Sequence, residues 1–231
     1  MKVHETARLN MVDSQLRPNR VTDERVLAAF GRIRRELFVP EPLRGIAYID
    51  EDLPLGGGRY LMEPLVAARL LQAAQLKRTE IALVVGAGSG YEAAVMAMLG
   101  KGVIALEEDL DLARRARAAL VEHGIATVSV VEGPLRQGWR PRAPYDVILF
   151  GGAIAEVPDE IADQLAEGGR LLAVIRPEGG GIGVPARSPI APGWGRALLL
   201  VRTGGAFGRR VLFDAATPLL PGFAPRPAFV F

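Results

Sequence analysis

The chain has 231 residues, of which 49% are hydrophobic and 23% charged, with 28 lysine or arginine residues against 26 aspartate or glutamate residues. This length supports one large core. The absence of cysteine excludes disulfide bonds, Cys-ligated zinc, iron–sulfur sites and a thiol nucleophile. Charge is nearly balanced, and neither a signal peptide nor about 18 consecutive apolar residues is evident. We expect a cytoplasmic protein that binds neither nucleic acid nor a membrane, and we predict no metal site.

The first third of the chain predicts helices. Apolar residues recur at three- and four-residue spacing over 26–33, as in a helix with one buried face. Residues 54–59 include three consecutive glycines, which predicts a loop, and Pro64 opens a second apolar-periodic helix. We expect residues 1–78 to form a helical and substrate-side segment with a mobile N-terminus. The arginine clusters, including the one at 32–35, are interpreted as solvated faces.

The centre of the chain alternates short apolar runs with helical stretches. Such runs are typical of parallel strands buried on both faces, and the stretches between them suit crossover helices. We therefore predict an α/β fold: a doubly wound, mostly parallel sheet with helices on both faces, an N-terminal helical extension and antiparallel C-terminal strands. The expected strands are 81–85, 103–106, 127–131, 147–150 and 170–175, with helices at 91–99, 110–123 and 158–166 and an antiparallel pair at 197–201 and 211–213.

We expect these elements to form a single domain over 1–231. Within it, residues 79–176 would be the cofactor-binding core, and 177–231 would supply the C-terminal strands and an apolar tail. Phe223, Phe229 and Phe231 of this tail are expected to cover the sheet, because large apolar side chains are usually buried. A lid or a subunit contact is the alternative.

Two sequence features predict a ligand site at the carboxyl edge of the sheet. Gly86-Ala87-Gly88-Ser89-Gly90 follows a strand and opens a helix, where such a loop exposes backbone N–H groups to a ligand. Dinucleotide binders place the third glycine one position later, where this chain has Tyr91, which disfavours a nicotinamide cofactor. Glu107 ends the next strand, where it would accept hydrogen bonds from ribose hydroxyls or cap the following helix. Glu132, beside Gly133, would meet an adenine amino group.

Several stretches of the chain also occur in a characteristic order and spacing. They are 23–39, 47–50, 58–64, 86–94, Glu107, 145–148, 157–158 and 164–171. In this order they resemble the protein-L-isoaspartate O-methyltransferase family over residues 8–176. The resemblance implies S-adenosylmethionine as cofactor, S-adenosylhomocysteine as product, and methyl transfer to a protein or peptide carboxylate.

The chain departs from that family on the acceptor side. Where the family usually has Ile-Ser-Ala-Pro-His, this chain has Leu61-Met62-Glu63-Pro64-Leu65. The resemblance places Arg59, Met62 and Glu63 on the acceptor side. A carboxylate nucleophile needs no general base, so catalysis would be largely placement of the reacting atoms. Glu63, however, presents a like charge to that carboxylate, and Arg59 would either pair with Glu63 or take the substrate anion itself.

The resemblance and the loop together define the predicted site and function. We expect a methyltransferase of this family. The alternative is a family member that binds the cofactor but does not repair isoaspartyl residues. Such a protein would act on a different, small acceptor, or would serve as a non-catalytic sensor or partner subunit. A nicotinamide-dependent oxidoreductase is a third hypothesis. The sequence does not define the oligomeric state. The predicted cofactor-binding residues are Pro64, Leu65, Gly86, Ala87, Gly88, Ser89, Gly90, Glu107, Glu132 and Gly133.

Overall fold

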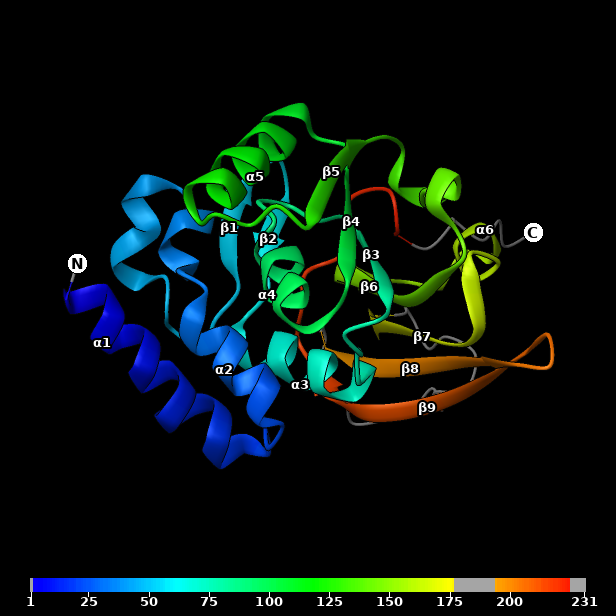
Figure 1. The fold of residues 1–231 in the computed structure, drawn as a ribbon, viewed down its shortest axis with the longest axis horizontal. Helices are drawn as coiled ribbons and strands as arrows, with labels where there is room; N and C mark the ends of the chain where they lie inside the picture. The colour runs from blue at the N-terminus through cyan, green and yellow to red at the C-terminus, as the bar shows by residue number, and fades with distance from the viewer. Residues whose placement is uncertain (1, 177–193, 225–231) are drawn as a thin grey trace, which may run out of the picture.

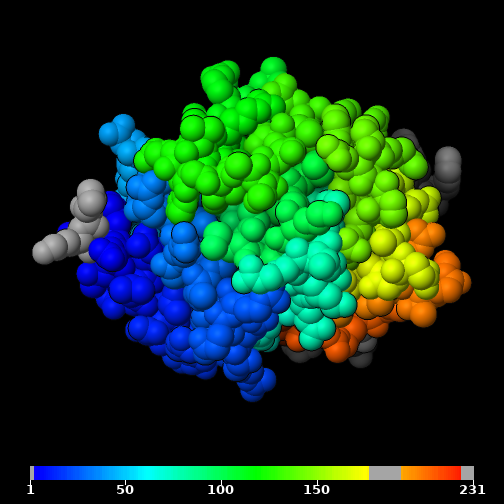
Figure 2. All heavy atoms as spheres, in the orientation of Figure 1, coloured from blue at the N-terminus to red at the C-terminus, as the bar shows by residue number. Residues whose placement is uncertain are grey.

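The computed structural model describes residues 2–176 and 194–224. The chain begins with helix α1 (Lys2–Asn10), which continues through helical turns at Met11–Leu16 and Arg17–Asn19 to α2 (Glu24–Arg32). The expectation of a mobile N-terminus is wrong for the described residues, because α1 packs along α2 and the Arg8 side chain donates to the Gly31 carbonyl (2.9 Å). These helices form one end of the molecule (Figures 1 and 2).

Helix α2 begins where the sequence provides a cap. The Asp23 side chain accepts hydrogen bonds from the N–H groups of Arg25 and Val26, which satisfies donors that have no partner within the helix. Its buried face includes Val26 and Phe30, as the apolar spacing predicts. Two short 3-10 helices, Arg35–Phe38 and Glu41–Ile46, follow.

The predicted loop at 54–59 is instead part of a small antiparallel hairpin. Strands β1 (Leu53–Gly56) and β2 (Arg59–Leu61) pair, and positive φ angles at the three glycines 56–58 make the turn between them. Helix α3 (Pro64–Ala74) then begins with proline in its first turn, as predicted.

A seven-stranded sheet forms the centre of the fold, in the order β5-β4-β3-β6-β7-β8-β9 (Figure 1). The first five strands in this order pair in parallel and the last two add antiparallel. The predicted α/β fold with antiparallel C-terminal strands is confirmed. The strands are β3 (Ile81–Val85), β4 (Gly102–Glu107), β5 (Val128–Glu132), β6 (Tyr145–Ile154), β7 (Leu165–Ile175), β8 (Gly195–Thr203) and β9 (Ala206–Ala215).

The two faces of the sheet are covered differently. Helices α2, α3, α4 (Tyr91–Leu99) and α5 (Leu110–Glu122) supply side chains to the core on one face, which receives Ala82 and Val84 of β3. The other face receives Leu83 and Val85 and is covered by the short α6 (Asp159–Ala162), by segments with 3-10 turns at Leu135–Gln137 and Arg140–Arg142, and by the chain that follows β9. Helix α6 is shorter than predicted, because Leu165 already belongs to β7.

The chain after β9 packs against the end of β6. Phe223 is buried and meets Phe150 edge to face, with ring centroids 5.6 Å apart. The prediction that the tail covers the sheet is confirmed for Phe223, whereas Phe229 and Phe231 lie outside the described residues. Over residues 2–176 and 194–224, no helix is both long and apolar enough to cross a membrane.

Candidate functional site

The candidate site lies where the order of the sheet reverses. Strand β3 is flanked by β4 on one side and β6 on the other, and a crevice at the carboxyl ends of such strands is where open α/β sheets bind ligands. The backbones approach closely at this point. A Cβ built on Gly151 of β6 would lie 2.2 Å from the carbonyl oxygen of Gly86, the residue that follows β3.

The glycine-rich loop after β3 is held by the chain itself. Gly86, Gly88 and Gly90 have φ angles of 74°, 56° and 93°, a region that side chains disfavour. The amides of Gly86 and of the following alanine both donate to the Leu106 carbonyl (3.0 Å each), and the Gly88 amide donates to Glu107 Oε2 (2.6 Å). The sequence predicted exposed N–H groups here, but these amides already have partners within the chain.

Glu107 is the centre of this arrangement. It is 0% exposed, and its Oε1 atom accepts hydrogen bonds from the amides of Glu108 and Asp109 (2.9 and 3.0 Å). The same oxygen pairs with Arg59 Nη1 at 2.6 Å. Of the two roles predicted for Arg59, pairing with Glu63 is therefore wrong, and contact with the substrate anion stays a prediction. Alternation along β2 turns the Arg59 side chain inward, toward Glu107. A ribose-binding role for Glu107 stays a prediction.

The end of β5 is more open. Glu132 pairs with Arg117 of α5 at 2.6 Å, and both side chains are partly exposed. Gly133 lines a surface hollow together with Trp139 and Glu160. An adenine-binding role for Glu132 and Gly133 stays a prediction, and on binding Arg117 would compete for the Glu132 carboxylate.

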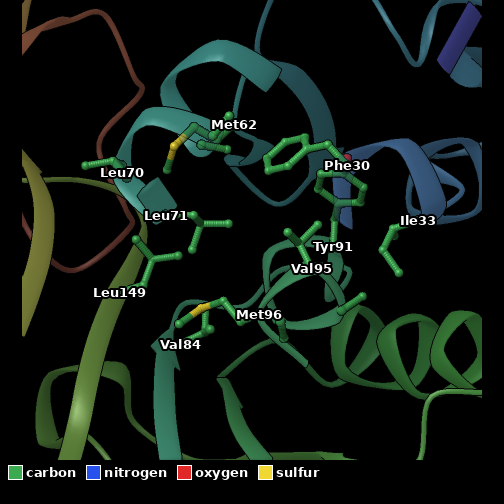
Figure 3. Packing of buried hydrophobic residues seen from close by; sticks show 14 of the residues in the cluster. Phe30, Ile33, Met62, Leu70, Leu71, Val84, Tyr91, Val95, Met96 and Leu149 are labelled. Carbon is green, nitrogen blue, oxygen red and sulfur yellow. The ribbon is translucent and has the colours of Figure 1, made fainter. Parts of the chain in front are cut away.

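On the acceptor side, Met62 does not line an open site. Its side chain is 1% exposed and points into the cluster that includes Phe30, Leu70 and Leu71 (Figure 3). The apolar thioether packs among other apolar groups of the core. An acceptor-side role for Met62 stays a prediction. Pro64 is also buried, in the first turn of α3, while the adjoining Leu65 is partly exposed.

Glu63 lies in a cluster of carboxylates at the start of α3. The Glu63 amide donates to Asp52 Oδ1 (2.9 Å), and the Leu65 amide donates to Asp50 Oδ1 (3.1 Å). These bonds satisfy N–H groups that have no partner within the helix. In the described ranges, no group of histidine or acidic side chains is arranged to hold a metal ion. The acidic cluster thus serves as the cap of α3.

Burial, and then the proximity of other carboxylates, raises the pKa values of two members of this cluster. Burial, reinforced by the charges of Asp52 and Asp50, raises the pKa of Glu63 to about 7. Burial likewise raises the pKa of Asp52 to about 6. Between about pH 4.5 and pH 7 the folded protein therefore holds a proton on Glu63 that the unfolded chain, with an ordinary pKa of 4.5, has largely released.

This difference predicts how stability depends on pH. A raised pKa in the folded state makes the free energy of unfolding fall as pH rises from about 4.5 to about 7. We expect Glu63→Gln to reduce that fall in urea titrations at pH 5 and pH 7.5. Glu5→Gln, on the exposed side of α1, is the matched control and should leave the wild-type pH dependence intact. An unchanged slope in Glu63→Gln would contradict the raised pKa.

Sequence reasoning missed two residues near this site. Arg35 belongs to the arginine cluster interpreted as solvated, yet it is fully buried. Leu220 packs over Gly86, where a built Cβ would lie 3.0 Å from its Cδ2 atom. An arginine cluster gives no local signal of burial, and the position of Leu220 depends on contacts far away in sequence. Asp146 accepts a hydrogen bond from the Ile81 amide (2.8 Å) at the start of β3, which is a structural role.

Comparison with known proteins identifies relatives over most of the chain. The family model described as protein-L-isoaspartate(D-aspartate) O-methyltransferase matches residues 7–181. A protein-L-isoaspartate O-methyltransferase of Methanoculleus marisnigri is 41% identical over 170 residues, which cover 74% of this chain and 77% of that protein. The protein-L-isoaspartate O-methyltransferase 2 of Anaeromyxobacter sp. is 42% identical over 175 residues, covering 76% and 72%.

Solved structures share the fold. One protein-L-isoaspartate O-methyltransferase superposes with a TM-score of 0.71 at 25% identity, over 88% of this chain and 63% of that one. A Plasmodium falciparum protein, described as a candidate member of the same enzyme class and solved in complex with S-adenosyl-L-homocysteine, gives a TM-score of 0.74 at 21% identity, over 94% and 97%. At this identity the second match supports the fold alone.

Proposed function

Because the chain belongs to the protein-L-isoaspartate(D-aspartate) O-methyltransferase family, we propose that it transfers a methyl group from S-adenosylmethionine to a carboxylate, with S-adenosylhomocysteine as product. The observation that carries this proposal is the position of Glu107, at the end of β4 and bonded to the glycine loop at the reversal point of the sheet. An acidic side chain at the end of this strand can accept hydrogen bonds from the hydroxyl groups of a ribose. The acceptor in this function is a protein or peptide, and the location is the cytoplasm.

The chemical types of the residues suit this cofactor. Glu107 would bind the ribose hydroxyls, Glu132 and Gly133 the adenine, and the glycines of the loop would allow close approach of the ligand to the main chain. When bound, the cofactor supplies an electrophilic methyl group. The tasks left to the chain are to orient the acceptor carboxylate and to exclude water, because a carboxylate has no proton to lose before attack.

In this conformation other side chains bury the glycine-rich loop. Ala87 and Ser89 are 2% and 3% exposed, and Arg59 and Leu220 lie over Gly86. The chemical types of these side chains suit the cofactor, and in this closed arrangement the cofactor would enter only if Arg59 and Leu220 moved.

One observation favours a second candidate, in which the acceptor is not an isoaspartyl peptide. The residues beside α3 that would face an acceptor carboxylate are themselves the carboxylates Asp50, Asp52 and Glu63. Two like charges about 4 Å apart repel by roughly 4 kcal/mol at an effective dielectric of 20. A neutral or cationic acceptor would avoid this repulsion.

Radiolabelled S-adenosylmethionine tests both candidates. We expect label to pass to an isoaspartyl-containing peptide, with transfer greater at pH 6 than at pH 8, because protonation of Glu63 below about pH 7 removes the like charge. Calorimetric titration with S-adenosylhomocysteine runs beside the assay. Binding without transfer to the peptide would support the second candidate, whereas a chain that neither binds nor transfers would contradict the proposed function.

A further inference from the structure

The ion pair between Arg59 and Glu107 joins the β1–β2 hairpin to the carboxyl end of β4. Both side chains are buried, at 4% and 0% exposure, and Arg59 Nη2 lies 3.0 Å from where a Cβ on Gly86 would be. The guanidinium therefore fills space directly over the start of the glycine loop. It also holds the Glu107 carboxylate, which is the group proposed to bind the ribose.

Leu220 also packs against Gly86. Its Cδ2 atom lies 3.0 Å from the Cβ position of Gly86, and its Cγ atom 2.8 Å from that of Gly152. The backbone is fixed there, because the Leu220 amide donates to the Ala153 carbonyl (2.8 Å) and the Ala153 amide donates to the Pro218 carbonyl (2.9 Å). This segment lies beyond residues 7–181, the part of the chain that the family model matches.

The closed arrangement is incompletely satisfied. Two buried nitrogen atoms of Arg59, Nε and Nη2, have no hydrogen-bond partner among the described residues. Unpaired donors of a buried charge are unfavourable, so the guanidinium is held in place against a cost. Glu107, in contrast, keeps three backbone amides as donors when Arg59 leaves. The Arg59–Glu107 ion pair can therefore separate without leaving the buried carboxylate unpaired.

We propose that Arg59 and Leu220 form an internal plug in the cofactor crevice, with Arg59 on Glu107 and Leu220 over Gly86, and that cofactor binding requires both side chains to move. This inference rests on the proposed function. It makes Arg59 a residue that sets cofactor affinity by competition. Removing the charge at Arg59 frees Glu107 and opens the space over Gly86.

Calorimetry with S-adenosylhomocysteine tests the competition. We expect Arg59→Gln to bind at least tenfold more tightly than the wild-type chain, because no ion pair has to be broken. Arg114→Gln is the matched control: Arg114 pairs with Asp111 at 2.7 Å on the exposed face of α5, so its removal should leave affinity unchanged. Equal affinity of Arg59→Gln and wild type would overturn the plug, and weaker binding by Arg59→Gln would show instead that Arg59 contacts the cofactor.

Thiol labelling tests the closure without relying on activity. The chain has no cysteine, so Leu220→Cys introduces a single reactive group. We expect this thiol to react far more slowly than one introduced as Val121→Cys, at a position that is 79% exposed. Adding Arg59→Gln, or S-adenosylhomocysteine, should accelerate the reaction at position 220. Equally fast labelling at both positions in the untreated single variants would overturn the closure.

The two experiments separate failure of the plug from failure of the proposed function. If neither the wild-type chain nor Arg59→Gln binds S-adenosylhomocysteine, the proposed function fails. The labelling result then still decides the plug: slow reaction of Leu220→Cys that accelerates with Arg59→Gln supports it, and fast reaction overturns it.

Discussion

Gly151→Ala is expected to lower the free energy of unfolding by about 3 kcal/mol or more, or to prevent folding. A Cβ at this position would lie 2.2 Å from the Gly86 carbonyl oxygen, which is a backbone atom and cannot move without displacing the end of β3. The φ angle of Gly151 is not positive, so the effect would be purely steric. Urea denaturation followed by circular dichroism measures it.

Gly45→Ala is the matched control for this substitution. The φ angle of Gly45 is also not positive, and a Cβ there would meet no atom of residues 2–176 or 194–224 within 4 Å. We expect a change within about 0.5 kcal/mol. A similarly small change for Gly151→Ala would mean that β3 and β6 separate easily at their carboxyl ends, and so that the crevice opens more readily than the structure indicates.

The central sheet could be predicted because its signal is local. Strands buried on both faces read as uninterrupted apolar runs, and residues 81–85 form β3 with the predicted bounds. The β1–β2 hairpin was missed because its strands are short and three glycines dominate its sequence. Helix α1 was missed because its residues are mostly polar, and a polar helix depends on tertiary contacts such as that of Arg8 with Gly31.

The candidate site was predictable only in part, because some of its features have a local sequence signal and others depend on tertiary contacts. The places of the glycine loop and Glu107 follow from where strands end, which the sequence reveals. The partners of these groups do not follow from the sequence, because whether Arg59 pairs with Glu63 or with Glu107 depends on how the hairpin folds over the sheet edge. The apolar character of Leu220 indicated burial but not what it would cover. The plug of Arg59 and Leu220 is therefore a property of tertiary packing that no single motif contains.

A second large loss of stability is expected on substitution of Arg35, whose side chain is 0% exposed. Its Nε atom donates to the Ala47 carbonyl (2.7 Å), its Nη2 atom donates to the Met62 carbonyl (2.8 Å), and its guanidinium lies 4.8 Å from the ring centroid of Tyr91. Arg35 thus connects three segments: the end of the 3-10 helix at 41–46, the residue before Glu63, and the first turn of α4. Its charge also opposes the rise that burial imposes on the pKa of Glu92.

Arg35→Met is therefore expected to lower the free energy of unfolding by about 3 to 5 kcal/mol. Methionine fills much of the volume but leaves two buried carbonyl groups unpaired, and hydrogen bonds to a charged group contribute roughly 1.5 to 3 kcal/mol each. Arg32→Met, at an exposed position of the same cluster, should change stability by no more than about 0.5 kcal/mol in the same urea titration. Equal effects of the two substitutions would return Arg35 to the solvated face that the sequence suggested. A much larger loss of stability for Arg35→Met than for Arg32→Met would show that the buried Arg35, only three residues from the exposed Arg32, holds the segment around Met62 in place.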